Sequence, residues 1–128
     1  MKILGIDYGE KRIGLAISDE GLMLARELNI LSPKEFWVTI ENLVATNEIK
    51  TIALGWPLAL SGNETKKTEE VNNFKLKLEA VVKIPVVLVD ERLSSVMAGN
   101  LAGGHKNIDS LAAQIILQNY LNQQKAST

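Results

Sequence analysis

The chain has 128 residues, of which 46% are hydrophobic and 23% charged, a composition typical of a globular protein that can bury one hydrophobic core. No apolar run approaches the ~20 residues that span a bilayer, and the absence of cysteine excludes disulfides and thiolate metal sites. The net charge of −1 argues against a protein that coats nucleic acid non-specifically. An acid at Asp7 interrupts the apolar start where a signal peptide would continue. We therefore expect one domain, residues 1–128, in the cytoplasm and not in a membrane.

Three strands are predicted at the beginning of the chain. Lys2–Asp7 is an apolar run that ends in an acid, as in a strand buried on both faces. Arg12–Ser18 and Leu22–Ile30 follow after short turns, the second of which is Asp19–Gly21. These short connections predict an antiparallel three-strand meander.

Helices and strands alternate in the rest of the chain. Ser32–Glu35 combines a capping box with a proline at the first helical position, which predicts a helix start. Ser61–Glu64 is a second possible capping box, followed by an apolar stripe at helical spacing. Thr51–Gly55 and Pro85–Val89 read as short buried strands, and a last helix is expected over Asp109–Gln123.

The order of these elements predicts the fold class. Alternation of helix and buried strand implies right-handed crossovers and parallel pairing. We therefore expect an α/β fold with a five-stranded mixed sheet, in which the antiparallel meander is joined by parallel strands and helices cover both faces.

Acidic residues stand at the ends of the predicted elements. Asp7 ends the first strand, Asp90 and Glu91 follow the last, and Asp109 begins the final helix. Ligands of parallel sheets gather at the carboxyl ends of the strands. Because side chains alternate along a strand, only one of Asp90 and Glu91 can share a site with Asp7. Such carboxylates suit Mg²⁺, and two of these ions can stabilise phosphodiester hydrolysis.

Each acid also has a structural explanation. Asp109 is a favoured N-cap residue, and Asp90 and Glu91 are polar residues where a strand leaves the core. Asp7 is harder to explain in this way, because a charge that closes an apolar run is costly without a partner.

Four segments resemble the motifs of the YqgF family. Gly5–Asp19 (GIDYGEKRIGLAISD) is similar to the opening motif, and Leu54–Pro57 (LGWP) with Ser61 and Gly62 is similar to the second. Val86–Ser95 (VVLVDERLSS) resembles the Asp-Glu-Arg motif, and Ile108–Gln118 (IDSLAAQIILQ) resembles the closing helix. The four occur in order and cover nearly the whole chain.

The resemblance implies an RNase H-like fold and a metal-dependent nuclease. The family is described both as Holliday-junction resolvases and as nucleases that trim the precursor of small-subunit ribosomal RNA. By this likeness Asp7, Glu91 and Asp109 occupy the catalytic and metal-binding positions. The resemblance also implies one or two Mg²⁺ (or Mn²⁺) ions that activate a water, and cleavage products that carry a 5′-phosphate. Positions expected near substrate phosphates are Lys11, Arg12 and Arg92, although a structural salt bridge explains Arg92 equally well.

The sequence departs from the family pattern in three places. Trp56 replaces the usual leucine, and a serine pair at 94–95 replaces two threonines. Many relatives carry a longer lysine- and arginine-rich loop where this chain has only Gly103–Asn107. The shorter loop weakens the expectation of tight duplex or junction binding. His105 is expected to be a solvated loop residue, with assistance to a leaving group or a metal as the alternative.

Two other functions remain open from the sequence. An Asp-x-Gly turn between strands also opens the nucleotide-binding domains of sugar kinases and actins, but these close two such domains around the nucleotide. A non-catalytic module that binds RNA, ribosomal particles or a protein would also fit the low positive charge. A homodimer is plausible because a four-way junction is two-fold symmetric.

Overall fold

The computed structural model describes residues 1–57, 61–90 and 108–126. Its strands are β1 (Lys2–Asp7), β2 (Ile13–Ser18), β3 (Ala25–Leu31), β4 (Ile49–Trp56) and β5 (Val86–Asp90). Its helices are α1 (Pro33–Thr46), α2 (Lys66–Val82) and α4 (Ile108–Ala126).

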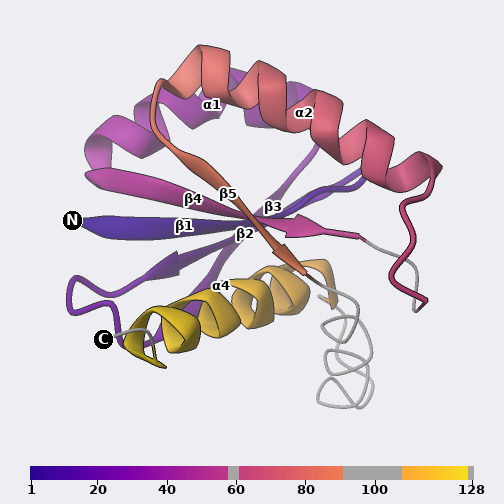
Figure 1. Cartoon of the computed structure of the whole chain (residues 1–128). Coiled ribbons are helices and arrows are strands. Elements are labelled where there is room, and N and C mark those ends of the chain that lie inside the picture. Colours follow the sequence, from indigo (N-terminus) through magenta and orange to yellow (C-terminus); the bar gives the residue numbers. More distant parts are fainter. Residues whose placement is uncertain (58–60, 91–107, 127–128) are drawn as a thin grey trace.

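The five strands form one mixed sheet in the order β3-β2-β1-β4-β5. The β1–β2 and β2–β3 pairs are antiparallel, and the β1–β4 and β4–β5 pairs are parallel. The predicted α/β fold, with a meander extended by parallel strands, is therefore confirmed (Figure 1).

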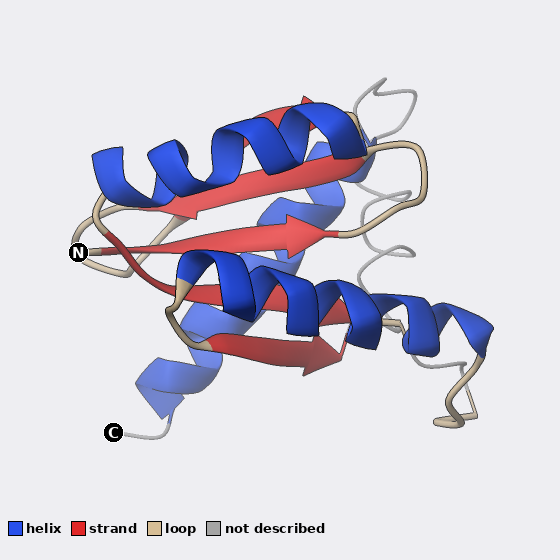
Figure 2. Cartoon of the chain, turned by 90° about the horizontal axis from the view of Figure 1, so that it is seen from above, coloured by secondary structure: helices blue, strands red, loops and turns tan. Residues whose placement is uncertain are grey.

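Helices cover both faces of this sheet. α1 and α2 lie side by side on one face, and α4 crosses the other face (Figures 1 and 2). Along β1, Leu4 and Ile6 pack into the core beneath α1 and α2, whereas Ile3 packs beneath α4. This alternation is the two-residue period of a strand, and it decides which face each residue at the strand end occupies.

The start of α1 agrees with the predicted capping box. The Ser32 hydroxyl accepts a hydrogen bond from the Glu35 backbone N–H at 3.2 Å, and the Glu35 carboxylate accepts one from the Ser32 N–H at 3.0 Å. Two hydrogen bonds with Ser32 lower the pKa of Glu35, and the one from the Ser32 backbone has a larger effect than the one with its side chain. Pro33 occupies the first turn, where its missing N–H costs nothing.

The start of α2 differs from the prediction. The capping box is formed by Thr65 and Thr68 and not by Ser61–Glu64, which lies before the helix. The Thr65 N–H donates to the Thr68 hydroxyl at 2.7 Å, and the Thr65 hydroxyl accepts from the Lys67 N–H at 3.2 Å. A buried threonine hydroxyl thus takes the role that glutamate usually plays, which the Ser-x-x-Glu pattern does not detect.

Two strands, β3 and β4, differ from their predicted bounds by more than one residue. β3 begins at Ala25 and not at Leu22, because Asp19 folds the preceding residues into a turn: its carboxylate accepts from the Met23 and Leu24 N–H groups at 2.8 and 3.2 Å. β4 is longer than expected at both ends.

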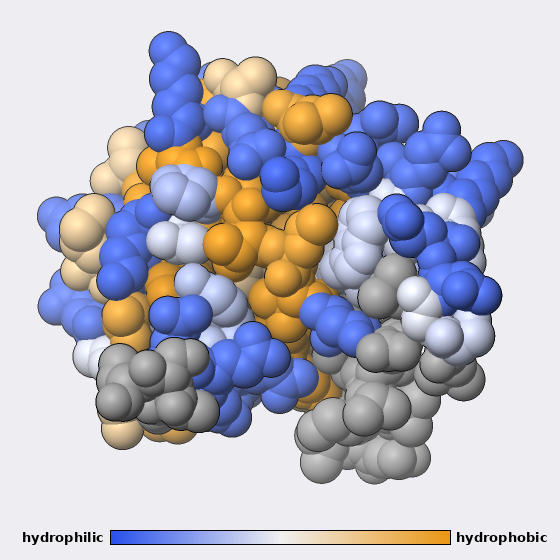
Figure 3. Space-filling view, in the orientation of Figure 1, coloured by the Kyte–Doolittle hydropathy of each residue, from blue (hydrophilic) through white to orange (hydrophobic). Residues whose placement is uncertain are grey.

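β5 forms one edge of the sheet. Apolar side chains gather on the side of the molecule where β5 lies toward the viewer (Figure 3). Across the described ranges, no helix is both long and apolar enough to cross a membrane.

Candidate active site

Asp7 is the last residue of β1 and is half-buried. It pairs with Gly14 of β2, and one residue beyond the Ile6–Leu54 pair it lies beside Gly55 of β4. Gly55 in turn pairs with Val89 of β5, which packs into the core beneath α4. By strand alternation, Asp7 therefore lies on the face of the sheet that α4 covers.

α4 makes its closest approach to the sheet at Gly5. A Cβ atom at Gly5 would lie 2.7 Å from the Leu117 Cβ and 3.0 Å from the Ala113 carbonyl oxygen. Glycine is therefore required here to let the helix rest on β1. This contact brings residues 113 and 117 of α4 over the same face of β1 as Asp7.

The first turn of α4 contains Asp109, and it lies toward the end of the sheet at which β1 ends (Figures 1 and 2). Residue 109 precedes Ala113 by four helical residues, roughly 6 Å along the axis, and Asp7 follows Gly5 by two strand residues, roughly 6.6 Å. The helix runs back over the sheet from that end, so positions 109 and 7 both lie toward the same end of one face. The structure thus describes two of the three predicted acidic positions and places both on the face that α4 covers.

Asp90, the last residue of β5, lies on the other face. It pairs with Trp56, and Leu88, two residues earlier, lines a hollow with Thr68 and Asn72 of α2. Asp90 shares the face of Leu88 by alternation and therefore faces away from Asp7. The choice that the sequence left open is thus decided against Asp90. Glu91, the other candidate, lies outside the described residues.

Of the remaining predicted positions, some are among the described residues and some are not. Lys11 and Arg12 are exposed in the turn between β1 and β2. This turn requires glycine at position 9, where a Cβ would lie 2.6 Å from the Arg12 carbonyl oxygen. Arg92, His105 and the loop 103–107 lie outside the described residues. Within the described side chains, no group of three or more histidine, cysteine, aspartate or glutamate residues could hold a metal; of the three predicted ligands only Asp7 is among them.

Lys11 lines a hollow of about 500 Å³ beside this strand end. The other residues that line it are Tyr8, Glu10, Lys66, Lys67 and Glu70. Tyr8, Lys66 and Lys67 are not among the site residues predicted from the sequence. The available signal was a pair of lysines in the first turn of a helix, where acidic residues are normally favoured.

Comparison with known proteins identifies the family. The family model described as "RuvX: Holliday junction resolvase" matches residues 1–123. A "Putative pre-16S rRNA nuclease" of Dictyoglomus thermophilum is 36% identical, with all of both chains covered. A relative with the same name from Maridesulfovibrio salexigens is 39% identical over 94% of this chain and 98% of that protein.

Solved structures share the fold. Thermus thermophilus RuvC in complex with a Holliday junction superposes with a TM-score of 0.63 and 16% identity, and covers 100% of this chain and 98% of that one. The fowlpox virus resolvase with its Holliday junction DNA superposes with a TM-score of 0.57 and 12% identity, over 97% and 99% of the two chains. The fold is thus that of the RNase H-like resolvases. The family model, the relatives and the four sequence motifs agree, and the chain belongs to the RuvX (YqgF) family.

Proposed function

We propose that this protein is a divalent-metal endonuclease that hydrolyses phosphodiester bonds in structured nucleic acid, with Asp7, Glu91 and Asp109 as its catalytic carboxylates. The observation that carries the proposal is the position of Asp7. It lies at the carboxyl end of β1, on the face covered by α4, whose first turn lies toward the same end of the sheet (Figure 2). Family membership supports the nuclease activity.

The donor set fits a hard cation. Asp7 offers carboxylate oxygens, which Mg²⁺ and Mn²⁺ prefer, and Glu91 and Asp109 are proposed to supply further carboxylate oxygens. A divalent ion held there would stabilise the negative charge that develops on the reacting phosphate. The carboxylates of this chain would orient the attacking water and the scissile phosphate against each other.

Lys11 and Arg12 are proposed to bind phosphates of the substrate backbone. Both are exposed in the turn that directly follows Asp7, so a strand whose scissile phosphate reaches Asp7 passes over them. Arg92, one residue beyond Glu91, is assigned the same role. These few local cations compensate for a net charge of −1 over the whole chain.

The substrate is proposed to be either junction DNA or the precursor of small-subunit ribosomal RNA. Relatives are named for the pre-16S rRNA, and the two superposed resolvases are solved with Holliday junctions. Both substrates contain strands that do not follow one continuous duplex. A homodimer, which would match the two-fold symmetry of a junction, is part of the proposal only for DNA.

The test is cleavage of labelled four-way DNA junctions and of pre-16S rRNA by the purified protein with Mg²⁺ or Mn²⁺. We expect cutting that requires the metal and that Asp7→Asn reduces by a factor of 10³ or more, roughly the scale of losing a group that acts on the transition state. Glu91→Gln and Asp109→Asn should behave in the same way. The preferred substrate decides between DNA and RNA.

Asp90→Asn is the matched control, because it removes the same charge from the opposite face of the same sheet edge. It should retain cleavage. Equal residual cutting by wild type and Asp7→Asn would contradict the proposal and would favour the non-catalytic binding module.

A further inference from the structure

The hollow beside the proposed active site has the composition of a nucleotide site. It lies between the β1–β2 turn, which supplies Tyr8, Glu10 and Lys11, and the start of α2, which supplies Lys66, Lys67 and Glu70. Its volume of about 500 Å³ is in the range of small-ligand pockets. It combines an aromatic ring, three cations and two carboxylates at one place.

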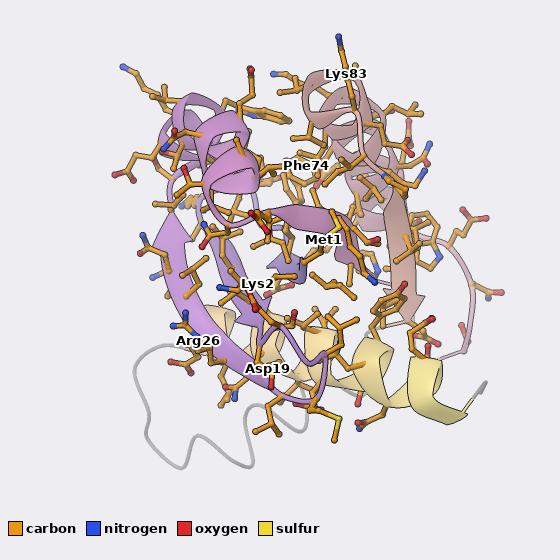
Figure 4. The ribbon with its side chains drawn as sticks, turned by 90° about the vertical axis from the view of Figure 1, so that its left-hand side faces the viewer. Met1, Lys2, Asp19, Arg26, Phe74 and Lys83 are labelled. Atoms are coloured by element: carbon orange, nitrogen blue, oxygen red, sulfur yellow. The ribbon has the colours of Figure 1, made fainter. Side chains whose placement is uncertain are left out.

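Tyr8 is the aromatic wall of this hollow. By alternation it lies on the face opposite Asp7, and its ring packs against Phe74 of α2 with a centroid separation of 4.5 Å (Phe74 is labelled in Figure 4). Phe74 also contacts Phe36 and Trp37 of α1, at 5.3 and 5.4 Å. The ring is thus supported from behind by a packed aromatic cluster while it lines the hollow, which is the arrangement of a stacking platform for a base.

Lys66 and Lys67 occupy a position that does not favour helix stability. They are the first two residues of α2 after the N-cap Thr65, next to the positive end of the helix dipole. Both are exposed, and the described residues show no salt bridge to either. Cations placed against the dipole and directed at a hollow are better explained by an anionic ligand than by folding.

Glu10 and Glu70 add hydrogen-bond acceptors to the same hollow. Burial raises the pKa of Tyr8, and the charges of Glu70 and then Glu10 raise it further, so both carboxylates act on this ring. Two carboxylates beside a phosphate site repel the phosphate and weaken its binding, unless they accept hydrogen bonds from another part of the ligand. The exocyclic amino groups of cytosine, adenine and guanine are such donors, and uracil and thymine lack them.

From these four observations we propose that the hollow binds one unpaired nucleotide of the substrate. The base stacks on Tyr8, Glu70 accepts a hydrogen bond from an exocyclic amino group, and Lys11, Lys66 and Lys67 bind the adjoining phosphates. The inference rests on the proposed nuclease function and deepens it, because Asp7 and Tyr8 are consecutive residues on opposite faces of one strand end. It specifies a substrate with a single-stranded, amino-bearing base next to the cleaved bond.

The experiment measures binding without cleavage. Wild-type protein in EDTA is titrated with fluorescent single-stranded oligonucleotides, oligo-dC against oligo-dT, and with a fully paired duplex. We expect tighter binding of oligo-dC than of oligo-dT, and weaker binding of the duplex than of either. Tyr8→Leu should weaken oligo-dC binding about tenfold, as expected for the loss of one base–aromatic stack. Glu70→Gln should reduce the preference for dC over dT.

The matched charge control is a pair of double variants. Lys66→Gln/Lys67→Gln should weaken binding with a Tm equal to or above that of wild type, because the helix dipole disfavours these lysines. Lys50→Gln/Lys83→Gln removes the same charge at the opposite ends of the strands, where Figure 4 shows Lys83 directed away from the molecule, and should leave binding unchanged.

A covalent readout locates the base. An oligonucleotide with one 5-iodocytosine, irradiated in the complex, should cross-link to Tyr8, and Tyr8→Leu should lose this adduct. Unchanged affinity of Tyr8→Leu and of the Lys66/Lys67 variant would overturn the inference, even if cleavage with metal is normal. Conversely, binding that depends on these residues without any metal-dependent cutting would support the nucleotide site and refute the nuclease.

Discussion

At the scale of single residues, the site depends on an absent side chain as much as on a carboxylate. Gly5 lets α4 approach β1 so closely that an added Cβ would meet the Leu117 Cβ at 2.7 Å. The contact involves the helix backbone as well, at the Ala113 carbonyl oxygen, which a rotamer change cannot relieve. The separation between α4 and the strand end of Asp7 is therefore determined by this glycine.

Gly5→Ala should shift α4 away from the sheet. We expect a loss of about 1–3 kcal/mol in the free energy of unfolding, the usual cost of overpacking, measured by urea denaturation. Cleavage should fall further than this stability change explains, because position 109 moves with the helix. Gly21→Ala is the control, since a Cβ there meets its nearest neighbour at 3.7 Å. A Gly5→Ala protein with full activity and stability would contradict this account of the helix position.

At the scale of elements, two glutamine side chains hold α4 against the start of β3. Gln118 accepts a hydrogen bond from the Ala25 N–H at 2.9 Å and donates one to the Met23 carbonyl oxygen at 3.0 Å. Gln114 donates to the Ala25 carbonyl oxygen at 3.1 Å. These bonds fix the rotation and the level of the helix, because hydrophobic contacts alone allow a helix to slide over a sheet.

Gln118→Ala should leave the N–H of Ala25, a residue only 7% exposed, without its acceptor. We expect a loss of about 1–3 kcal/mol in the free energy of unfolding. Amide hydrogen exchange should increase at Ala25 and along α4. Gln124→Ala removes an exposed glutamine from the same helix and should change neither quantity. Equal exchange rates in the two variants would show that packing alone positions the helix.

At the scale of the whole molecule, the chain has 14 basic and 15 acidic residues, so its overall charge gives no attraction for nucleic acid. Binding must then come from cations gathered at one place, as Lys11, Lys66 and Lys67 are around the hollow. Lysines that neutralise single-strand phosphates release counterions, and each contributes about −0.7 to the slope of log K against log salt concentration.

The salt dependence of oligo-dC binding should therefore have a slope of about −3.5, for the three lysines of the hollow together with Arg12 and Arg92. Fluorescence anisotropy between low and moderate salt measures it directly. In Lys66→Gln/Lys67→Gln the slope should fall to about −2, since two contacts of about −0.7 each are lost. A slope far steeper than about −3.5 would indicate more phosphate contacts than these five cations supply.

The local sequence determined the fold class and the first carboxylate of the site. The apolar run of β1, the short turns and the alternation of helix with strand are local patterns, so they predicted the mixed sheet without knowledge of long-range contacts. The capping box at Ser32 was predicted for the same reason, whereas the start of α2 was misplaced because Thr68 imitates the usual glutamate. The order of the four motifs predicted the family.

Only the tertiary structure decided which residues meet. Whether Asp90 shares a face with Asp7 depends on the pairing register of β1, β4 and β5 and on the face that α4 covers. A local sequence pattern predicts neither of these. The hollow at Tyr8 joins residues about 60 positions apart in the sequence, which come together because α2 packs on the face opposite Asp7. Strand period and caps act over a few residues, so they define the elements. Packing acts across the whole chain, and it alone brings together the described residues of the proposed sites.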